Sequence, residues 1–239
     1  MLKTVSYKKV GNKKLSEHVS LSEVKSSKSD TVKYDTTTIN TIEKVIKFFN
    51  CSKCIISSGY RTLSEEIALG GSNTGPHVAG RAVDIAFYDA KGKIIPSAKI
   101  VLYLEDLGIK GIAVNCGGNK NYTHFDCNHR INKYYGDEAV NFRSIWYTNS
   151  KYTSFYKYVK NPYTEPKNNV QKGDKGNDVF WVQFHLKRLG YLKGVVIKGV
   201  FGAKTEKAVK QFKKDYQVTA NKKPNGVVGA GTIKKLKNV

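Results

Sequence analysis

The chain has 239 residues, 40% of them hydrophobic, and 41 Lys and Arg against 19 Asp and Glu give it a formal net charge of +22. Its 15 Tyr and 10 Phe can fill the core of one large or two small globular domains, which argues against a disordered chain. No run of about 18 apolar residues is present, which excludes a membrane-spanning helix. The charge predicts an anionic partner, either nucleic acid or a bacterial wall with its teichoic acids.

The distribution of charge makes nucleic acid the less favoured partner. Basic residues are spread along the whole chain, and no nucleic-acid-binding signature interleaves them with aromatic residues. The segment Met1 to Leu15 is charged and lacks the apolar core and small-residue cleavage site of a secretory signal peptide. We therefore expect synthesis in the cytoplasm without a signal peptide.

The first predicted elements are a helix and two strands. The helix begins near the capping residues Asp35–Thr36, and its apolar face consists of Ile39, Ile42, Val45, Ile46 and Phe49. A short buried strand is expected at Ile55–Ser58 and ends at Gly59. The apolar and β-branched residues of Ala82–Phe87 predict a second strand.

A second helix and two further strands complete the N-terminal part. Ser97 is expected to cap this helix, which Gly108 closes, and its apolar face consists of Ile100, Val101, Leu104 and Leu107. Ile112–Val114 and Tyr122–Cys127 add strands to a small sheet. Helices and strands in this irregular order predict an α+β domain.

The segment 147–169 is expected to join two domains. It is rich in Thr, Ser, Asn, Lys and Tyr, contains Pro162 and Pro166, and has no sustained apolar period. We therefore expect domains at 1–146 and 170–239 with a linker at 147–169.

The C-terminal part contains a short internal repeat. Residues 199–205 (GVFGAKT) are echoed by 226–232 (GVVGAGT), and each copy is a glycine-bounded turn whose Thr is expected to cap a helix. A further apolar face precedes both copies and consists of Val179, Val182, Leu186 and Leu189. The pattern predicts a compact, all-α unit of three helices.

The four cysteines allow three interpretations. Cys51 and Cys54 form a Cys-x-x-Cys pair, and Cys116 and Cys127 follow later. They could be free, partly buried thiols, ligands of a structural zinc, or two disulfides.

His77, Asp84 and His124 are typical of a metal site. Two imidazole nitrogens and one carboxylate oxygen are common ligands of catalytic zinc, and three protein ligands leave a fourth position for the activated water. His124 and Asp126 are two residues apart in a predicted strand, so their side chains face the same side. Asp126 could then handle protons beside the metal ligand. Taken singly, a histidine beside a glycine turn or an aspartate in a strand is more often structural.

Three motifs resemble those of one group of zinc peptidases. They are Ser58-Gly-Tyr-Arg61, then Pro76-His77-x-x-Gly80-x-Ala82-x-Asp84, then Thr123-His124-Phe-Asp126. The pattern is similar to D-Ala-D-Ala carboxypeptidases and phage L-alanyl-D-glutamate endopeptidases, whose fold core, a small sheet, is also that of hedgehog domains. The resemblance implies that Zn²⁺ is held by His77, Asp84 and His124. It implies that Arg61 is catalytic and substrate-binding, through a substrate carboxylate or the developing oxyanion.

The sequence departs from this family at the expected general base. Many relatives carry an acid a few residues before the last His, but residues 111–123 contain none, and Gly75 stands where a Ser is common. Strand geometry makes Asp126 our candidate for the catalytic base. The alternative is that Asp126 accepts a hydrogen bond and orients a neighbouring histidine.

The C-terminal part resembles the peptidoglycan-binding domain of three helices. The resemblance covers residues 170–237 and rests on the order of Gly173, Gly176 and Trp181 followed by the two repeated turns. Lys198 stands where an Asp usually precedes the first turn. The glycines and apolar residues of this pattern indicate the fold rather than the ligand-binding residues.

Together the resemblances imply a modular phage endolysin or bacterial autolysin. Such a bacteriolytic, antimicrobial metallopeptidase would be released at lysis and cleave a stem-peptide or cross-link amide of the cell wall, with L-alanyl-D-glutamate as the expected bond. The alternatives are a D-Ala-D-Ala carboxypeptidase, a non-catalytic wall-binding protein with a structural metal, and a nucleic-acid-binding protein.

Overall fold

The computed structural model describes residues 1–116, 121–127, 133–137, 154–195, 197–218 and 223–239. The chain divides into two compact units, Met1–Thr153 and Ser154–Val239. Among the described residues, no helix has the length and apolar character needed to cross a membrane. The α+β fold predicted for the first unit and the helical fold predicted for the second are both confirmed.

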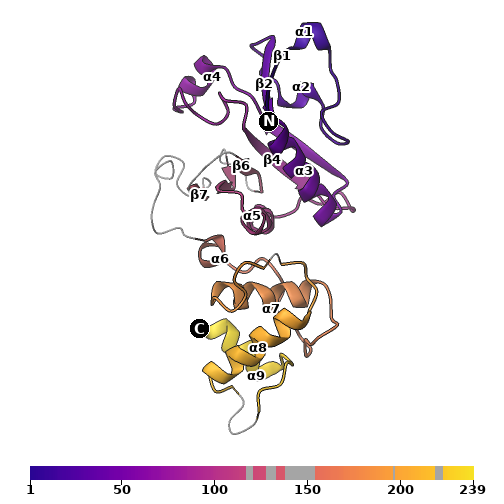
Figure 1. Cartoon of the computed structure of the whole chain (residues 1–239), viewed down its shortest axis with the longest axis vertical. Helices are drawn as coiled ribbons and strands as arrows, with labels where there is room; N and C mark the ends of the chain where they lie inside the picture. Colours follow the sequence, from indigo (N-terminus) through magenta and orange to yellow (C-terminus); the bar gives the residue numbers. More distant parts are fainter. Residues whose placement is uncertain (117–120, 128–132, 138–153, 196, 219–222) are drawn as a thin grey trace. The chain divides into compact units, whose positions relative to one another are not determined.

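A five-stranded sheet organises the first unit (Figure 1). Its strands lie in the order β3-β4-β6-β5-β7, and they span Lys53–Ser58, Ala82–Tyr88, Thr123–Asp126, Gly111–Val114 and Lys133–Asp137. The pairs from β3 to β5 are antiparallel, as expected, whereas β5 and β7 run parallel. β7 falls outside the strands that we predicted.

The strand β3 is an edge strand, and this corrects its predicted burial. Its residues alternate between exposed and half-buried, and Ile55 is 39% exposed. An edge strand is covered by a neighbour on one side only, whereas β4 in the interior of the sheet is buried along nearly its whole length. The ladder between β3 and β4 shifts register at Ser57, so that Ser58 lies opposite Asp84. Such irregularities alter the direction of side chains.

The two predicted helices pack beside this sheet. Helix α3 (Thr36–Phe49) lies against β4 and ends at Asn50 in the left-handed region, and Asp35 caps it by accepting from the Thr37 N–H. Helix α5 (Ser97–Asp106) lies against β5 and β6. Ser97 was expected to cap α5, but the cap is Pro96, and the Ser97 hydroxyl lies 2.7 Å from that of Thr123.

A small N-terminal layer was not predicted. Strands β1 (Leu2–Ser6) and β2 (Thr31–Asp35) form an antiparallel pair, connected through the short helices α1 (Tyr7–Val10) and α2 (Leu21–Val24). α2 packs against β2 and β3. This layer therefore covers the part of β3 that leads to Arg61.

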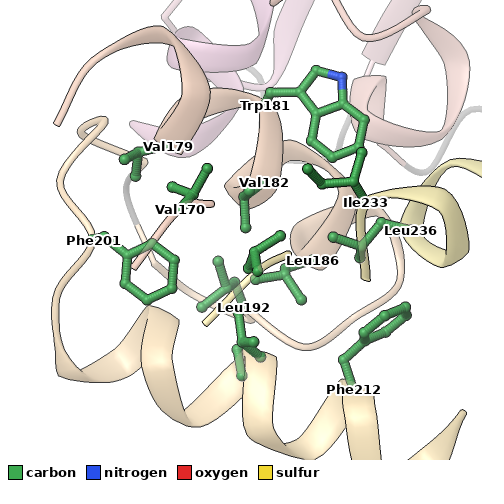
Figure 2. Packing of buried hydrophobic residues seen from close by; sticks show 13 residues of the cluster. Val170, Val179, Trp181, Val182, Leu186, Leu192, Phe201, Phe212, Ile233 and Leu236 are labelled. Atoms are coloured by element: carbon green, nitrogen blue, oxygen red, sulfur yellow. The ribbon is translucent and has the colours of Figure 1, made fainter. Parts of the chain in front are cut away.

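The second unit is built around helix α7 (Asn177–Arg188). It contacts α6 (Phe155–Tyr158), α8 (Ala203–Asp215) and α9 (Ala230–Asn238). Figure 2 shows the core between these helices, with Val182 and Leu186 of α7 near the middle. The core residues that Figure 2 labels are Val170, Val179, Trp181, Val182, Leu186, Leu192, Phe201, Phe212, Ile233 and Leu236.

Helices α8 and α9 start three residues earlier than predicted. Gly202 and Gly229 occupy the cap positions, whereas Thr205 and Thr232 lie within the first turns and are buried. The Thr205 hydroxyl accepts a hydrogen bond of 3.0 Å from the Gln183 amide, so it serves contact between helices rather than capping.

Part of the expected linker packs onto the second unit. Phe155 and Tyr156 of α6 are buried, and the Asn161 amide donates to the carbonyl of Trp181. Residues 147–153 lie outside the described part of the chain. The domain boundaries stay a prediction.

Candidate metal centre

His77 is held in one orientation by a compact turn. Gly80 closes this turn with a φ of +70°, and its N–H donates to the carbonyl of His77. A Cβ at Gly80 would lie 2.5 Å from the backbone of Lys33 in β2, so the close approach of the two segments requires glycine. The His77 Nδ1–H donates to the Gly59 carbonyl at 2.7 Å. This tautomer leaves a lone pair on Nε2, which faces Asp84 and His124.

Sheet register brings the other two predicted ligands together. Asp84 in β4 and His124 in β6 are directly opposite each other in the antiparallel ladder. Cross-strand partners lie on the same face, and here His124 Nδ1 is 2.8 Å from Asp84 Oδ1. His77 Nε2 lies 3.3 Å from each of these two atoms.

This group has the chemistry of a metal-binding site. Its ligand atoms lie within 4.8 Å of one another, and all three residues are buried. Two imidazoles and one carboxylate are the donor set of open catalytic zinc sites. The structure thus brings together the predicted residues His77, Asp84 and His124, and their donor atoms fit a zinc ion.

The charges in this group oppose the effect of burial. Burial alone would raise the pKa of Asp84, but electrostatic interactions and hydrogen bonds with the two neighbouring histidines, His77 and His124, hold that pKa well below its usual range. Burial alone would lower the pKa of His124, whereas contacts with Asp126 and Asp84 raise it to about 10. The site therefore favours an ionised Asp84, the form that binds a cation.

Arg61 contacts protein oxygens with each of its three guanidinium nitrogens. Nη2 donates to Asp84 Oδ2 at 2.7 Å, Nη1 to Glu66 Oε2 at 3.0 Å, and Nε to the Ser58 hydroxyl at 2.8 Å. Because Oδ2 of Asp84 is bound to Arg61, Oδ1 is the oxygen that faces the two histidines. Arg61 therefore orients Asp84 in this structure.

Glu66 is a site residue that our sequence reasoning missed. It lies in helix α4 (Leu63–Ala68), is 1% exposed, and forms an ion pair with Arg61. A Cβ at Gly71 or Gly75 would lie 2.4 or 2.7 Å from its Oε1, so these two glycines make room for the carboxylate. An acid five residues after Arg61, followed by two glycines, was the available signal.

Asp126 lies beside His124, on the ring nitrogen that does not face Asp84. Its Oδ2 is 3.8 Å from His124 Nε2, and its side chain is buried. The expectation that His124 and Asp126 share one side of β6 agrees with this contact. The two ring nitrogens of a histidine point in different directions. Nδ1 of His124 faces Asp84 and the candidate metal site, and Nε2 faces Asp126.

Comparison with known families identifies the first unit. Residues 7–126, about half of the chain, match the profile of the family described as Peptidase M15. The chain belongs to the peptidase M15 family. This match contains all three motifs on which we based the resemblance. Residues 175–236 of this M15 peptidase match the profile of the peptidoglycan binding domain.

Solved structures give weaker likenesses. The N-terminal domain of SleB is 31% identical over 31% of this chain and 96% of its own, with a TM-score of 0.28. A peptidoglycan-binding protein from Clostridioides difficile is 38% identical over 28% of this chain and 39% of its own, with a TM-score of 0.25. The L-Ala D-Glu endopeptidase ChiX from Serratia marcescens is 16% identical over 41% of this chain and 82% of its own, with a TM-score of 0.29. These TM-scores add nothing to the family assignment. No curated protein matches the sequence.

A second group of potential ligands lies elsewhere on the M15 domain. Glu17, His18 and Glu43 bring ligand atoms within 4.8 Å of one another, but Glu17 is exposed and the other two are half-buried. His18 donates to Glu43 from its backbone N–H, and its Nδ1 lies 2.8 Å from the Glu43 carboxylate. These two contacts hold the N-terminal segment against α3 and explain the grouping without a metal.

The cysteines are separate from the candidate metal centre. Cys51, Cys54 and Cys127 carry free thiols, and among the described residues no cysteine belongs to either group of potential ligands. Burial raises the pKa of Cys51 to about 11 and that of Cys54 to about 12. These thiols stay protonated at neutral pH, which favours the reading of partly buried, unreactive thiols.

Proposed function

We propose that this chain is a zinc-dependent peptidase that cleaves an amide bond in the stem peptide of peptidoglycan. The observation that carries the proposal is the buried group of His77, Asp84 and His124 in a domain of the M15 family. The peptidoglycan-binding domain on the same chain supports a wall substrate, because it would keep the peptidase on its polymer. Teichoic acids are a second anionic wall component that a chain of net charge +22 would attract.

Different residues orient the different metal-binding side chains. A zinc ion bound here would polarise the scissile carbonyl and lower the pKa of a bound water. The carbonyl of Gly59 fixes the tautomer of His77, and Arg61 fixes the direction of Asp84. Such outer contacts orient ligands and strengthen metal binding.

Asp126 is best explained as the residue that orients His124. Its carboxylate lies 3.8 Å from Nε2, whereas Nδ1 of the same ring faces Asp84 and His77. A carboxylate behind a ligating histidine is a common arrangement in zinc sites. The sequence alone suggested Asp126 as the general base, a role in which its carboxylate must reach the attacking water directly. Its contact with His124 supports the orienting role instead.

We infer an endopeptidase that acts on the L-alanyl-D-glutamate bond and is delivered to the wall as an endolysin at lysis. The alternative within the family resemblance is a D-Ala-D-Ala carboxypeptidase, which would release a single terminal residue. A non-catalytic wall-binding protein with a structural metal is the alternative outside enzymes. The products released from a defined substrate distinguish these three activities.

Zinc removal and restoration on purified cell walls test the proposal. The protein as prepared should lower the turbidity of the wall suspension, chelation should stop this, and added Zn²⁺ should restore it. The matched variant is His77→Ala, which should sediment with walls through its C-terminal domain without clearing them. Wall binding without any clearing by the zinc-loaded protein would instead identify a non-catalytic wall-binding protein.

A further inference from the structure

A pocket of about 450 Å³ with both polar and apolar lining residues lies beside Arg61 and is not explained by metal binding. One wall comes from the segment that follows α2, another from β3 and the residues after it, and a third from α4. The residues lining it that matter here are Lys25, Lys28, Ser57, Arg61, Glu65 and Leu69. Arg61 also contacts Asp84 at 2.7 Å, so one side chain separates the pocket from a candidate metal ligand.

The pocket has a fixed wall. The Tyr60 N–H donates to the Val24 carbonyl at 2.7 Å, and a Cβ at Gly59 would lie 2.6 Å from that same oxygen. The Ser26 hydroxyl donates to Glu65 at 2.7 Å and accepts from the Lys28 N–H at 2.9 Å. These contacts hold the lysine-bearing segment against the residues that lead to Arg61.

The charged groups lining the pocket are mainly positive. Lys25, Lys28 and Arg61 contribute three cations, and Glu65 contributes the one acidic side chain among the lining residues. Burial would raise the pKa of Glu65, but hydrogen bonds from Ser26 and Thr62, with a smaller contribution from the charge of Lys28, outweigh it and lower that pKa. Glu65 Oε2 accepts from the Ser26 hydroxyl and from both the N–H and the hydroxyl of Thr62, so its charge is already stabilised by the protein.

The two lysines are better placed than Arg61 to receive an anion from outside. Each guanidinium nitrogen of Arg61 already donates to a protein oxygen, two of them on carboxylates. Among the residues that the structure describes, the Lys25 ammonium forms one hydrogen bond, to the neutral carbonyl of Ser26 at 3.1 Å, and it lies over the ring of Tyr7. Lys28 is exposed at the rim. The Lys25 ammonium therefore keeps its charge available for a carboxylate from outside, and Lys28, whose charge also acts on Glu65, adds a second cation at the rim.

The third wall is apolar beyond Glu65, at the C-terminal end of α4. Ala68 and Leu69 line the pocket at the end of α4, and Leu69 is 60% exposed. An exposed leucine at the edge of a charged pocket offers a surface for the aliphatic part of a ligand. Cationic and apolar walls together fit a short peptide that has an acidic residue beside alanine.

We propose that this pocket binds the acidic residue of the peptide substrate, with its carboxylate at Lys25 and Lys28 and its aliphatic neighbour on Ala68 and Leu69. The inference rests on the proposed function and deepens it, since it names the substrate feature that the enzyme selects. It moves carboxylate recognition from Arg61, as the family resemblance implies, to a lysine pair on the segment after α2. The pocket sets specificity, and the metal centre performs the cleavage.

The test compares two stem peptides that differ only in the glutamate carboxylate, which one of them carries as a carboxamide. The wild-type protein should have the higher kcat/KM on the acidic peptide. In Lys25→Ala and Lys28→Ala this preference should fall by about fivefold each, mainly through KM, because each removes one partly exposed charge contact. Lys28→Arg should keep the preference, since it keeps the charge.

The matched control is Lys44→Ala, an exposed lysine of α3 outside the pocket, which should keep the wild-type preference. Equal kcat/KM on both peptides, or an unchanged preference in the pocket variants, would overturn the inference. Calorimetric titration of chelator-treated protein with both peptides separates this inference from the proposed function. If the acidic peptide binds more tightly but the zinc-loaded protein cleaves neither peptide, the pocket is supported and the peptidase activity is refuted. If the zinc-loaded protein cleaves both peptides equally well, the peptidase activity is supported and the pocket is refuted.

Discussion

Asp84 and His124 lie directly opposite each other on strands β4 and β6, with His124 Nδ1 2.8 Å from Asp84 Oδ1. The pairing of two strands therefore positions two candidate ligands that are forty residues apart in sequence. A shift of one residue in this ladder would turn one of the side chains to the other face of the sheet. The accuracy of the centre thus depends on register, and β3, through Ser58 and Arg61, supports Asp84 from the other side.

Arg61→Lys tests whether Arg61 acts on Asp84 or on substrate. A lysine keeps the charge but loses the fork of donors that contacts Asp84, Glu66 and Ser58 together. We expect zinc affinity to fall about tenfold or more, as for other outer contacts of metal ligands. Competition with a zinc-binding dye measures this. Unchanged zinc affinity with a raised KM would instead assign Arg61 to substrate binding.

Asp126→Asn distinguishes an orienting residue from a general base. If Asp126 orients His124, zinc affinity should fall about 10- to 100-fold, and peptide hydrolysis should recover when zinc saturates the protein. If Asp126 is the base, zinc should remain bound while kcat falls by about 100-fold or more. Zinc titration and kcat measured on the same preparation distinguish the two roles. We predict lower zinc affinity with recovered hydrolysis, which is the result expected of an orienting residue.

The sequence predicted best those features that depend on neighbouring residues. Asp35 begins α3 because its carboxylate accepts from an N–H two residues later, and the apolar spacing of α3 repeats from turn to turn. The alternation of β6 was enough to place His124 and Asp126 on one side. Local geometry accounts for these predictions, whereas the three metal ligands were proposed from the chemistry of their donor atoms and from the motif resemblance.

Features that depend on distant partners were missed or predicted wrongly. Ile55 is exposed because β3 lies at the edge of the sheet. The residues of one strand do not determine its position in the sheet. Ser97 bonds with Thr123, twenty-six residues later, instead of capping α5. The contact of Arg61 with Asp84 needs the register of β3 on β4, which the spacing of residues does not specify.

Gly80→Ala should destabilise the first unit. The new Cβ would lie 2.5 Å from the backbone carbonyl carbon of Lys33, at a φ of +70°. We expect a loss of about 2 kcal/mol or more in the free energy of unfolding, since neither backbone can move cheaply. Gly92→Ala is the control, because its φ of +74° is similar and a Cβ there would have no atom of the described residues, other than its chain neighbours, within 4 Å. It should cost only the strain of the left-handed region, about 1–2 kcal/mol. Equal losses in denaturant titrations of both variants would contradict the close packing at Gly80.

His185 should make the second unit less stable at acid pH. Burial, together with the positive charge of Arg188, lowers the pKa of His185 to about 4, whereas its ordinary value is 6.5. Between these values the unfolded chain binds a proton that the folded chain does not, so stability falls as pH drops from about 6.5 to about 4. His185→Phe keeps an aromatic ring beside Trp181 and removes this titration. The difference in unfolding free energy between the two proteins should change in favour of the variant as pH falls. A difference that stays constant between pH 7 and pH 4 would show that His185 does not titrate in this way.

The most direct test of the account is mass spectrometry of the fragments that the zinc-loaded protein releases from purified peptidoglycan. We predict fragments with a new amino terminus and a new carboxyl terminus within the stem peptide, at the L-alanyl-D-glutamate bond, and their absence with His77→Ala. A released terminal D-alanine as the sole product would identify a carboxypeptidase. No new termini with the zinc-loaded protein, or the same fragments from His77→Ala, would contradict a peptidase centred on His77, Asp84 and His124.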